Sequence, residues 1–271
     1  MSAVTAPPAT STAGRDLGLT WGHVLAAEGR RLRTLRSTWW FAGVLALFVA
    51  LFGTMPAIGV ALGVLEAAPP DAAALGGALS GLSPAGLLVV GFGVLAASGE
   101  YATGMVAATF TAVPRRTTVV LARALAVAVA VLVPSSVLTF ATYGLVRVLL
   151  ASGGVDLPTA PGTTGALVGA AVGLTAQAVL GVAAGWLLRS TAGGITAVVV
   201  LLHMVPAVGL ILPVGVADRV LPWMPINILG MLMTPGPVQG MPPVWAALAA
   251  LAGYVVAALA LAALVVRRRD V

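Results

Sequence analysis

Side chains that could perform acid–base or metal chemistry are scarce in this 271-residue chain, since only 8% of its residues are charged and none is cysteine. The lack of cysteine excludes disulfides, thiolate catalysis and Cys-ligated metals. The two histidines, His23 and His203, lie far apart in the sequence. An intramembrane enzyme would need His clustered with Glu or Asp at depth, and only His203 lies deep in an apolar run. We therefore expect no catalytic residues and no metal ligands.

All 14 basic residues are arginine. A phosphate-binding loop of the G-x-x-x-x-G-K-[ST] type requires a lysine, so this chain cannot contain one. If the protein uses ATP, the nucleotide and its Mg must be bound by another chain, and we expect no cofactor in this one.

The main polar interruption is E-Y-A-T-G-M-V-A-A-T-F-T-A-V-P-R-R, residues 100–116. Gly104 and Pro114 bracket a segment in which apolar side chains recur at helical spacing: Met105, Val106, Phe110 and Val113. This pattern predicts a short amphipathic helix at the inner membrane surface. Such a helix could dock a cytosolic partner or lie on lipid as a connector.

The remaining sequence is dominated by long, continuously apolar runs, and 60% of all residues are hydrophobic. Membrane-spanning helices need roughly 20 apolar residues each, whereas barrel strands would alternate in short segments. We therefore predict an all-α integral membrane protein with six transmembrane helices within residues 38–271. The expected spans are residues 39–65, a run that ends at 99 with an unclear start, 119–150, 163–188, 191–216 and 243–266.

The arginines predict the orientation of these spans. With both termini in the cytoplasm, 12 of the 14 arginines lie on the inner side, and only Arg147 and Arg219 lie outside. The positive-inside rule favours this topology strongly. It also accounts for the net charge of +6, so nucleic-acid binding is not needed to explain the basic character.

Two segments precede the first span. Residues 1–19 are rich in Ala, Pro, Thr and Ser and are expected to form a disordered tail. Residues 20–37 predict an amphipathic helix in the inner interface, with arginines facing lipid head groups. Glu28 falls on its apolar side. It could pair with Arg31 or Arg36, form a plain surface ion pair with Arg31, or reach a partner protein.

The fourth span carries glycines at regular helical spacing, with Gln177 completing the series: Gly165, Gly169, Gly173, Gly181 and Gly185. Such a face could slide or dimerise, but ordinary packing within the bundle is the favoured interpretation. Gln177 and His203 could touch a substrate, or hydrogen-bond a neighbouring helix. Pro134 and Pro206 are expected to bend their helices.

The segment 217–242 is apolar but broken by prolines into stretches too short to span. Short re-entrant or interfacial helices fit it best. Its large side chains could form a plug over a central pathway, or belong to a membrane-seated loop without a gating role. The candidate valve residues are Trp223, Met224, Ile226, Met231 and Met233.

Two stretches resemble the membrane subunits of bacterial ATP-binding-cassette exporters of the type-2 permease family. One is E-G-R-R-L-R-T-L-R-S-T-W-W, residues 28–40, and the other is G-E-Y-A-T-G-M-V-A-A-T-F-T-A-V-P-R-R, residues 99–116. The remainder is similar only in its six-span layout. One departure is Ala107, where related sequences often carry a basic residue.

The resemblance implies a homodimer or heterodimer of six-helix subunits in the bacterial cytoplasmic membrane, with two ATPase subunits docked on the inner face. Residues 20–37 would be the interface helix, 100–117 the coupling loop and 217–242 the extracellular valve. The implied ATPase-coupling residues are Glu28, Glu100, Tyr101, Thr103, Gly104, Met105, Phe110, Arg115 and Arg116.

An exporter of hydrophobic or amphipathic compounds, such as drugs, lipids or peptides, is therefore the leading hypothesis. An ion-coupled secondary transporter is the alternative. Such transporters usually show charged residues near the midplane and internal repeats, and the sequence displays neither clearly. An intramembrane enzyme is the least favoured hypothesis, for want of clustered polar groups.

Overall fold

The structure is a computed structural model that describes residues 20–65, 70–112, 115–154 and 159–268. Every regular element in these ranges is a helix, so the all-α prediction is confirmed. Within them, five helical stretches are long and apolar enough to cross a membrane, which indicates a multi-pass membrane protein. They are α2 (Arg36–Ala61), the stretch Ala74–Thr103, α6 (Arg116–Ser152), α7 (Thr163–Leu188) and α12 (Val244–Arg268). The proposed tail, residues 1–19, lies outside the described residues.

The second span is made of two helices. A short helix, α3 (Pro70–Ser80), leads through Gly81 into α4 (Leu82–Thr103). Gly81 lies directly against the backbone of α2, since a Cβ there would lie 2.7 Å from the carbonyl oxygen of Val49. The glycine-rich sequence that obscured the start of this span therefore permits a close approach to the first span.

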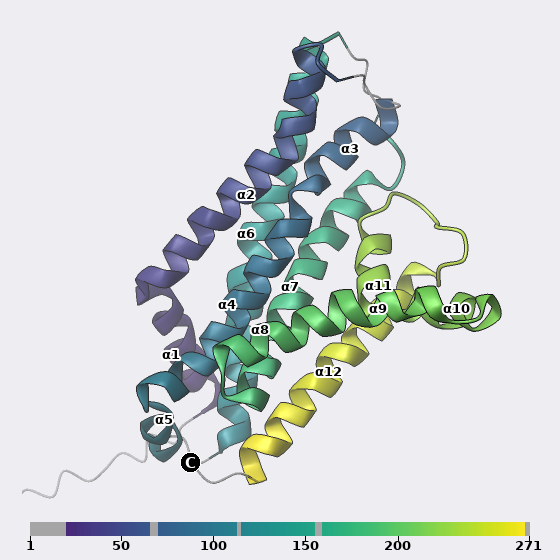
Figure 1. Ribbon diagram of the computed structural model, residues 1–271. Helices are drawn as coiled ribbons and strands as arrows, with labels where there is room; N and C mark the ends of the chain where they lie inside the picture. The colour runs from purple at the N-terminus through teal and green to yellow at the C-terminus, as the bar shows by residue number, and fades with distance from the viewer. Residues whose placement is uncertain (1–19, 66–69, 113–114, 155–158, 269–271) are drawn as a thin grey trace, which may run out of the picture.

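Helix α7 forms the centre of the bundle, with α4, α6 and α12 packed around it (Figure 1). Of the most apolar stretch of α7, 83% is buried inside the protein, whereas 17% of the corresponding stretch of α12 is buried. Helix α1 (Trp21–Thr34) and the seven-residue α5 (Val106–Ala112) lie at the same end of the bundle as the C-terminal end of α12.

Glycines allow α4 and α7 to pack backbone to backbone. A Cβ on Gly181 would lie 2.5 Å from the carbonyl oxygen of Val90, and one on Gly185 would lie 2.7 Å from that of Val94. Gly169 meets the carbonyl oxygen of Leu232 instead, whereas Gly165 faces open space. Most of the glycine series therefore contacts neighbouring helices of this chain, which agrees with the interpretation of ordinary packing within the bundle.

Replacing Gly93 with alanine is expected to destabilise the bundle by about 1–3 kcal/mol. Gly93 contributes to the α4–α7 contact from the other side, and a Cβ there would overlap the carbonyl oxygen of Ala178. The midpoint of thermal unfolding in detergent measures the effect. Gly144→Ala, on the open side of α6 with nothing within 4 Å of the added atom, should leave that midpoint unchanged. Equal midpoints for the two variants would contradict the packing assignment.

The fifth expected span is not one continuous α-helix. It consists of α8 (Thr191–Val199), the π-helical turn Val200–Met204, α9 (Val205–Ala207) and the 3₁₀ turn Val208–Ile211. Pro206 offers no backbone N–H to the preceding turn, which explains why the helix widens just before it. The regular apolar stretch is Thr191–Ala207, shorter than the five candidate spans. The predicted count of six spans therefore stays a prediction.

The segment after this break folds into short helices, as expected for residues 217–242. Helix α10 (Val214–Val220) and the 3₁₀ turn Leu221–Trp223 precede α11 (Pro225–Leu232). Helix α11 packs against both α7 and α12, as Figure 1 shows.

Candidate functional site

Helix α1 places a carboxylate on its buried face. Val24, Glu28 and Leu32 are its three buried residues, and their spacing of four puts them on one side of the helix. Glu28 is only 7% exposed, so its charge requires a partner inside the protein. The expected pair with Arg31 is present at 3.6 Å, but it is not a plain surface pair, because Glu28 is buried and has a further partner.

That partner is Arg123 in the first turns of α6. Its Nη2 lies 2.6 Å from Oε1 of Glu28, and its Nε lies 3.1 Å from Oε2, so the guanidinium donates two parallel hydrogen bonds. Two-pronged contacts of this kind are the strongest arrangement of arginine with a carboxylate. Arg123 is itself 1% exposed. Its third donor, Nη1, bonds to the carbonyl oxygen of Ala96 in α4 at 3.3 Å.

Glu100 completes the cluster from the last turn of α4. Its Oε1 accepts from Nη2 of Arg123 at 2.6 Å and lies 2.8 Å from Nη1 of Arg31. Arg31 also lies 3.6 Å from Glu28. We call these four residues, Glu28, Arg31, Glu100 and Arg123, the charged cluster. It joins α1, α4 and α6, which are far apart in sequence.

The charged cluster balances two carboxylates with two guanidinium groups. Three of the four side chains are at least nine-tenths buried, and only Arg31 is partly exposed, at 32% of its side chain. Removing one partner of a buried ion pair leaves an uncompensated charge and costs about 3–5 kcal/mol. The cluster therefore fixes the positions of α1, α4 and α6 relative to one another.

An aromatic group packs beneath the charged cluster. The Trp186 ring lies 5.2 Å from the Arg123 guanidinium carbon, and Trp186 is fully buried. Tyr101 meets Trp186 edge-on with ring centroids 5.8 Å apart, and Phe110 of α5 lies 5.9 Å from it. Trp186 thus connects the charged cluster to α5 through direct ring contacts.

The polar interruption is shorter than the sequence suggested. Glu100, Tyr101 and Thr103 belong to α4, and the break begins at Gly104, which ends that helix in the left-handed conformation with φ of +70°. Glycine adopts this conformation without a Cβ penalty. Thr103 bonds to its own helix through the Gly99 carbonyl oxygen. Val113 and Pro114 lie outside the described residues.

Helix α5 buries only part of its predicted apolar face. Val106 and Phe110 are buried, whereas Met105 precedes the helix and is 60% exposed. The expectation that Met105 shares a face with Phe110 is therefore wrong, because Met105 lies in the turn that follows Gly104. An exposed methionine at this end of the bundle is available to another protein.

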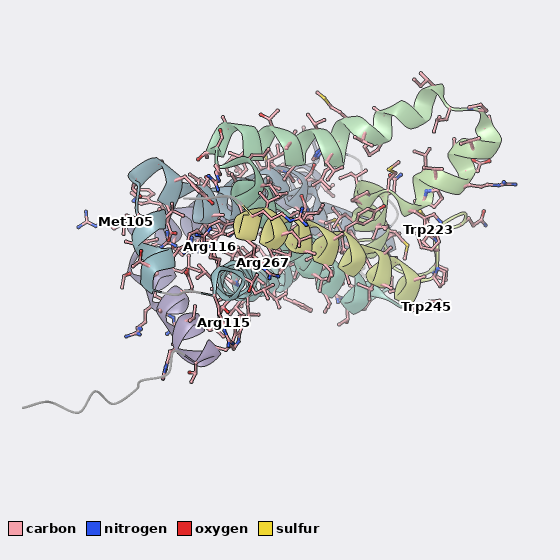
Figure 2. The ribbon with its side chains drawn as sticks, turned by 90° about the horizontal axis from the view of Figure 1, so that it is seen from below. Met105, Arg115, Arg116, Trp223, Trp245 and Arg267 are labelled. Atoms are coloured by element: carbon pink, nitrogen blue, oxygen red, sulfur yellow. The ribbon has the colours of Figure 1, made fainter. Side chains whose placement is uncertain are left out.

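The paired arginines after α5 differ in their surroundings. Arg115 is exposed. Arg116 donates from Nη1 to the carbonyl oxygen of Val266 at 3.2 Å, and its guanidinium carbon lies 5.3 Å from the Phe110 ring centroid. Figure 2, seen from below, shows Arg116 beside Arg267 near the end of α12. Arg116 therefore ties α5 to α12, while Arg115 faces outward.

Gln177 and His203 do not lie together. Gln177 is buried in α7 and faces α4, since a Cβ on Gly86 would lie 2.7 Å from its Oε1. His203 is exposed on the π-helical turn, with Nδ1 3.3 Å from the carbonyl oxygen of Val199. Helix packing accounts for Gln177, and His203 lies on the outer surface of this chain.

The candidate valve residues divide between core and surface. Met231 is buried with Ile228, Leu229 and Leu232 against α7 and α12, and the half-buried Met233 packs on the central core. Met224 is half-buried, and Ile226 packs beside the core residues of α11.

Trp223, by contrast, is exposed, and its carbonyl oxygen accepts a hydrogen bond from the Tyr254 hydroxyl at 3.0 Å. In Figure 2 it lies near Trp245, away from the labelled arginines.

The predictions from sequence name Arg31 as a possible partner of Glu28 but do not identify Arg123 and Trp186 as members of the site. Arg123 counts among the inner arginines of the predicted topology, and it lies four residues inside an apolar run. An ionisable residue in such a run needs a partner, and Glu28 on the apolar side of its helix needs one of opposite sign. The sequence therefore contains an arginine and a glutamate that each need a partner of opposite charge, and this is the pattern from which their pairing could be predicted.

Protein-family models give no match to this chain, and no curated protein matches it. The site is therefore interpreted from its geometry. Its carboxylates and guanidinium groups already bond to one another, so their arrangement holds α1, α4 and α6 in position.

Proposed function

We propose that this chain is the membrane permease subunit of a bacterial type-2 ATP-binding-cassette exporter. The observation that carries the proposal is the charged cluster. It joins α1, which would be the interface helix, to α4 and α6, the two helices that flank the coupling segment. A push on α5 from a cytosolic ATPase would then move three helices together.

The contacts of α5 support this role. Phe110 reaches the charged cluster through Trp186, and Arg116 reaches the end of α12. Through these contacts, a movement of α5 would reach both α6 and α12. Its neighbours Met105 and Arg115 are exposed and would contact the ATPase. ATP and Mg would be held entirely by that partner.

The proposed assembly has two permease chains and two ATPase subunits in the cytoplasmic membrane, with both termini of this chain inside. Arg115, Arg116 and Arg267 gather at one end of the bundle, as the positive-inside rule requires of inner residues (Figure 2). The broken helix α8–α9 and the short helices α10 and α11 would form the sixth membrane-embedded unit and the outer valve. The apolar surfaces favour a hydrophobic or amphipathic cargo.

Co-purification tests this proposal. The chain alone should hydrolyse no ATP, and it should co-purify with an ATP-binding-cassette ATPase encoded beside it. In proteoliposomes, the two together should transport in an ATP-dependent manner. Transport by this chain alone, driven by a proton gradient and indifferent to ATP, would contradict the proposal and favour a secondary transporter.

A further inference from the structure

A groove of about 610 Å³ lies where α1 meets α2 and α6. Its volume is within the range of ligand sites in proteins. The α6 wall is an apolar stripe from Leu125 to Pro134, and Leu25 and Leu32 line it from α1. Away from the edge of the groove, the lining side chains are apolar and cannot form hydrogen bonds to a polar ligand.

The length of the groove fits one acyl chain of a single leaflet. Leu125 and Pro134 are nine residues apart on α6, which corresponds to about 13 Å along a helix. Half of the hydrocarbon core of a bilayer is about 15 Å thick. The groove is open along its side and belongs to a segment that spans a membrane, so a lipid tail can enter it directly.

The edge of the groove is basic. Arg33 lines it and is exposed, and Arg30 and Arg36 are exposed on the adjoining turns. In the part of the chain that the structure describes, none of these three arginines forms an ion pair, because the acidic residue of α1, Glu28, is held in the charged cluster.

A tryptophan indicates the lipid head-group level at this edge. Trp39 lines the groove and donates from its indole nitrogen to the carbonyl oxygen of Arg33 at 2.9 Å. Tryptophan is typical of the membrane–water interface. Thr38 also belongs to the lining, but its hydroxyl oxygen is buried and does not face the groove's open edge. A head group at this level would therefore meet the Arg33 cation.

We propose that this groove holds one anionic phospholipid of the inner leaflet, with an acyl chain along α6 and its phosphate beside Arg33. Basic pockets between helices on the cytoplasmic side are a recognised way of binding acidic head groups. The proposal requires only that α1 lies at the inner interface, and it holds whether or not the chain belongs to an ATP-driven exporter.

Native mass spectrometry of the purified chain, titrated with phosphatidylglycerol or phosphatidylcholine of matched chains, tests the proposal. We expect one phosphatidylglycerol to be retained in preference to phosphatidylcholine. Arg33→Gln should weaken its binding about fivefold, the effect of one arginine near an anionic lipid. Arg219→Gln, an exposed arginine on α10, should leave binding unchanged.

A second pair of variants tests the groove itself. Gly29 lines it, and a Cβ there would meet nothing within 4 Å, so Gly29→Leu should fill the groove without disturbing α1. It should reduce retained phosphatidylglycerol at least as much as Arg33→Gln, whereas Gly144→Leu on open α6 surface should not. Equal retention of both lipids, or equal effects of variant and control, would overturn the proposal. A change in oligomeric mass with unchanged lipid binding would assign the groove to a second copy of the chain and would also overturn it.

Discussion

Arg123→Met is expected to destabilise the protein by about 3–5 kcal/mol, because it leaves Glu28 and Glu100 buried without their shared partner. Methionine keeps much of the aliphatic volume of arginine, so the loss reflects charge and hydrogen bonding more than a cavity. The yield of folded protein and the thermal unfolding midpoint in detergent measure the effect.

A triple variant separates the charge effect from simple loss of packing. Adding Glu28→Gln and Glu100→Gln to Arg123→Met removes the buried charges together, which is often close to neutral for stability. The triple variant should therefore recover most of the stability that the single variant loses. A single variant as stable as the parent chain, or a triple variant less stable than the single one, would contradict the role of the charged cluster.

The second large effect is expected at Met105 and Arg115, two exposed residues of the proposed coupling loop. Met105→Ser combined with Arg115→Ala should weaken binding of the proposed ATPase partner about tenfold, a loss of about 1.4 kcal/mol, if these exposed side chains are among the few that carry most of the binding energy. Both side chains are exposed, so the unfolding midpoint should stay unchanged. Pull-down of the ATPase and ATP-dependent transport in proteoliposomes provide the two readouts.

The matched control is Met204→Ser with Arg219→Ala, a second exposed methionine and arginine outside the coupling segment. It should retain ATPase binding. If it lost binding to the same extent, the proposed docking surface would be wrong. Glu100→Ala is a poorer probe, because Glu100 is 5% exposed and bonded within the charged cluster. Loss of transport in that variant would combine misfolding with uncoupling.

The sequence predicts the long helices well because hydropathy and continuous length define them almost completely. It predicts the fifth span poorly, because apolar composition continues through residues 205–216 while Pro206 interrupts the backbone hydrogen bonds. Whether a helix with an internal proline continues depends on its neighbours. Pro134 shows the opposite outcome, since α6 continues through it.

The candidate site could be predicted only in part. Periodicity correctly predicts that Glu28 lies on the apolar side of its helix. The polar break contains Glu100 and Phe110, whose role in ATPase coupling stays a prediction. The pairing of Glu28 with Arg123 joins residues 95 positions apart, and no local pattern specifies which helices become neighbours. Met105 is exposed because Gly104 ends α4 in a left-handed conformation, so that Met105 lies in a turn and does not continue the helix.

The charged cluster also imposes an order on biosynthesis. A nascent chain exposes Glu28 first, then Glu100, and only later Arg123, which bonds to both. Among the described residues, the ionic partner of the Glu28 carboxylate that is synthesised before Arg123 is Arg31, one turn away on the same helix. Docking of the first helix should therefore wait for the third hydrophobic segment, and ribosome-arrested chains that end before residue 123 should leave α1 accessible to protease.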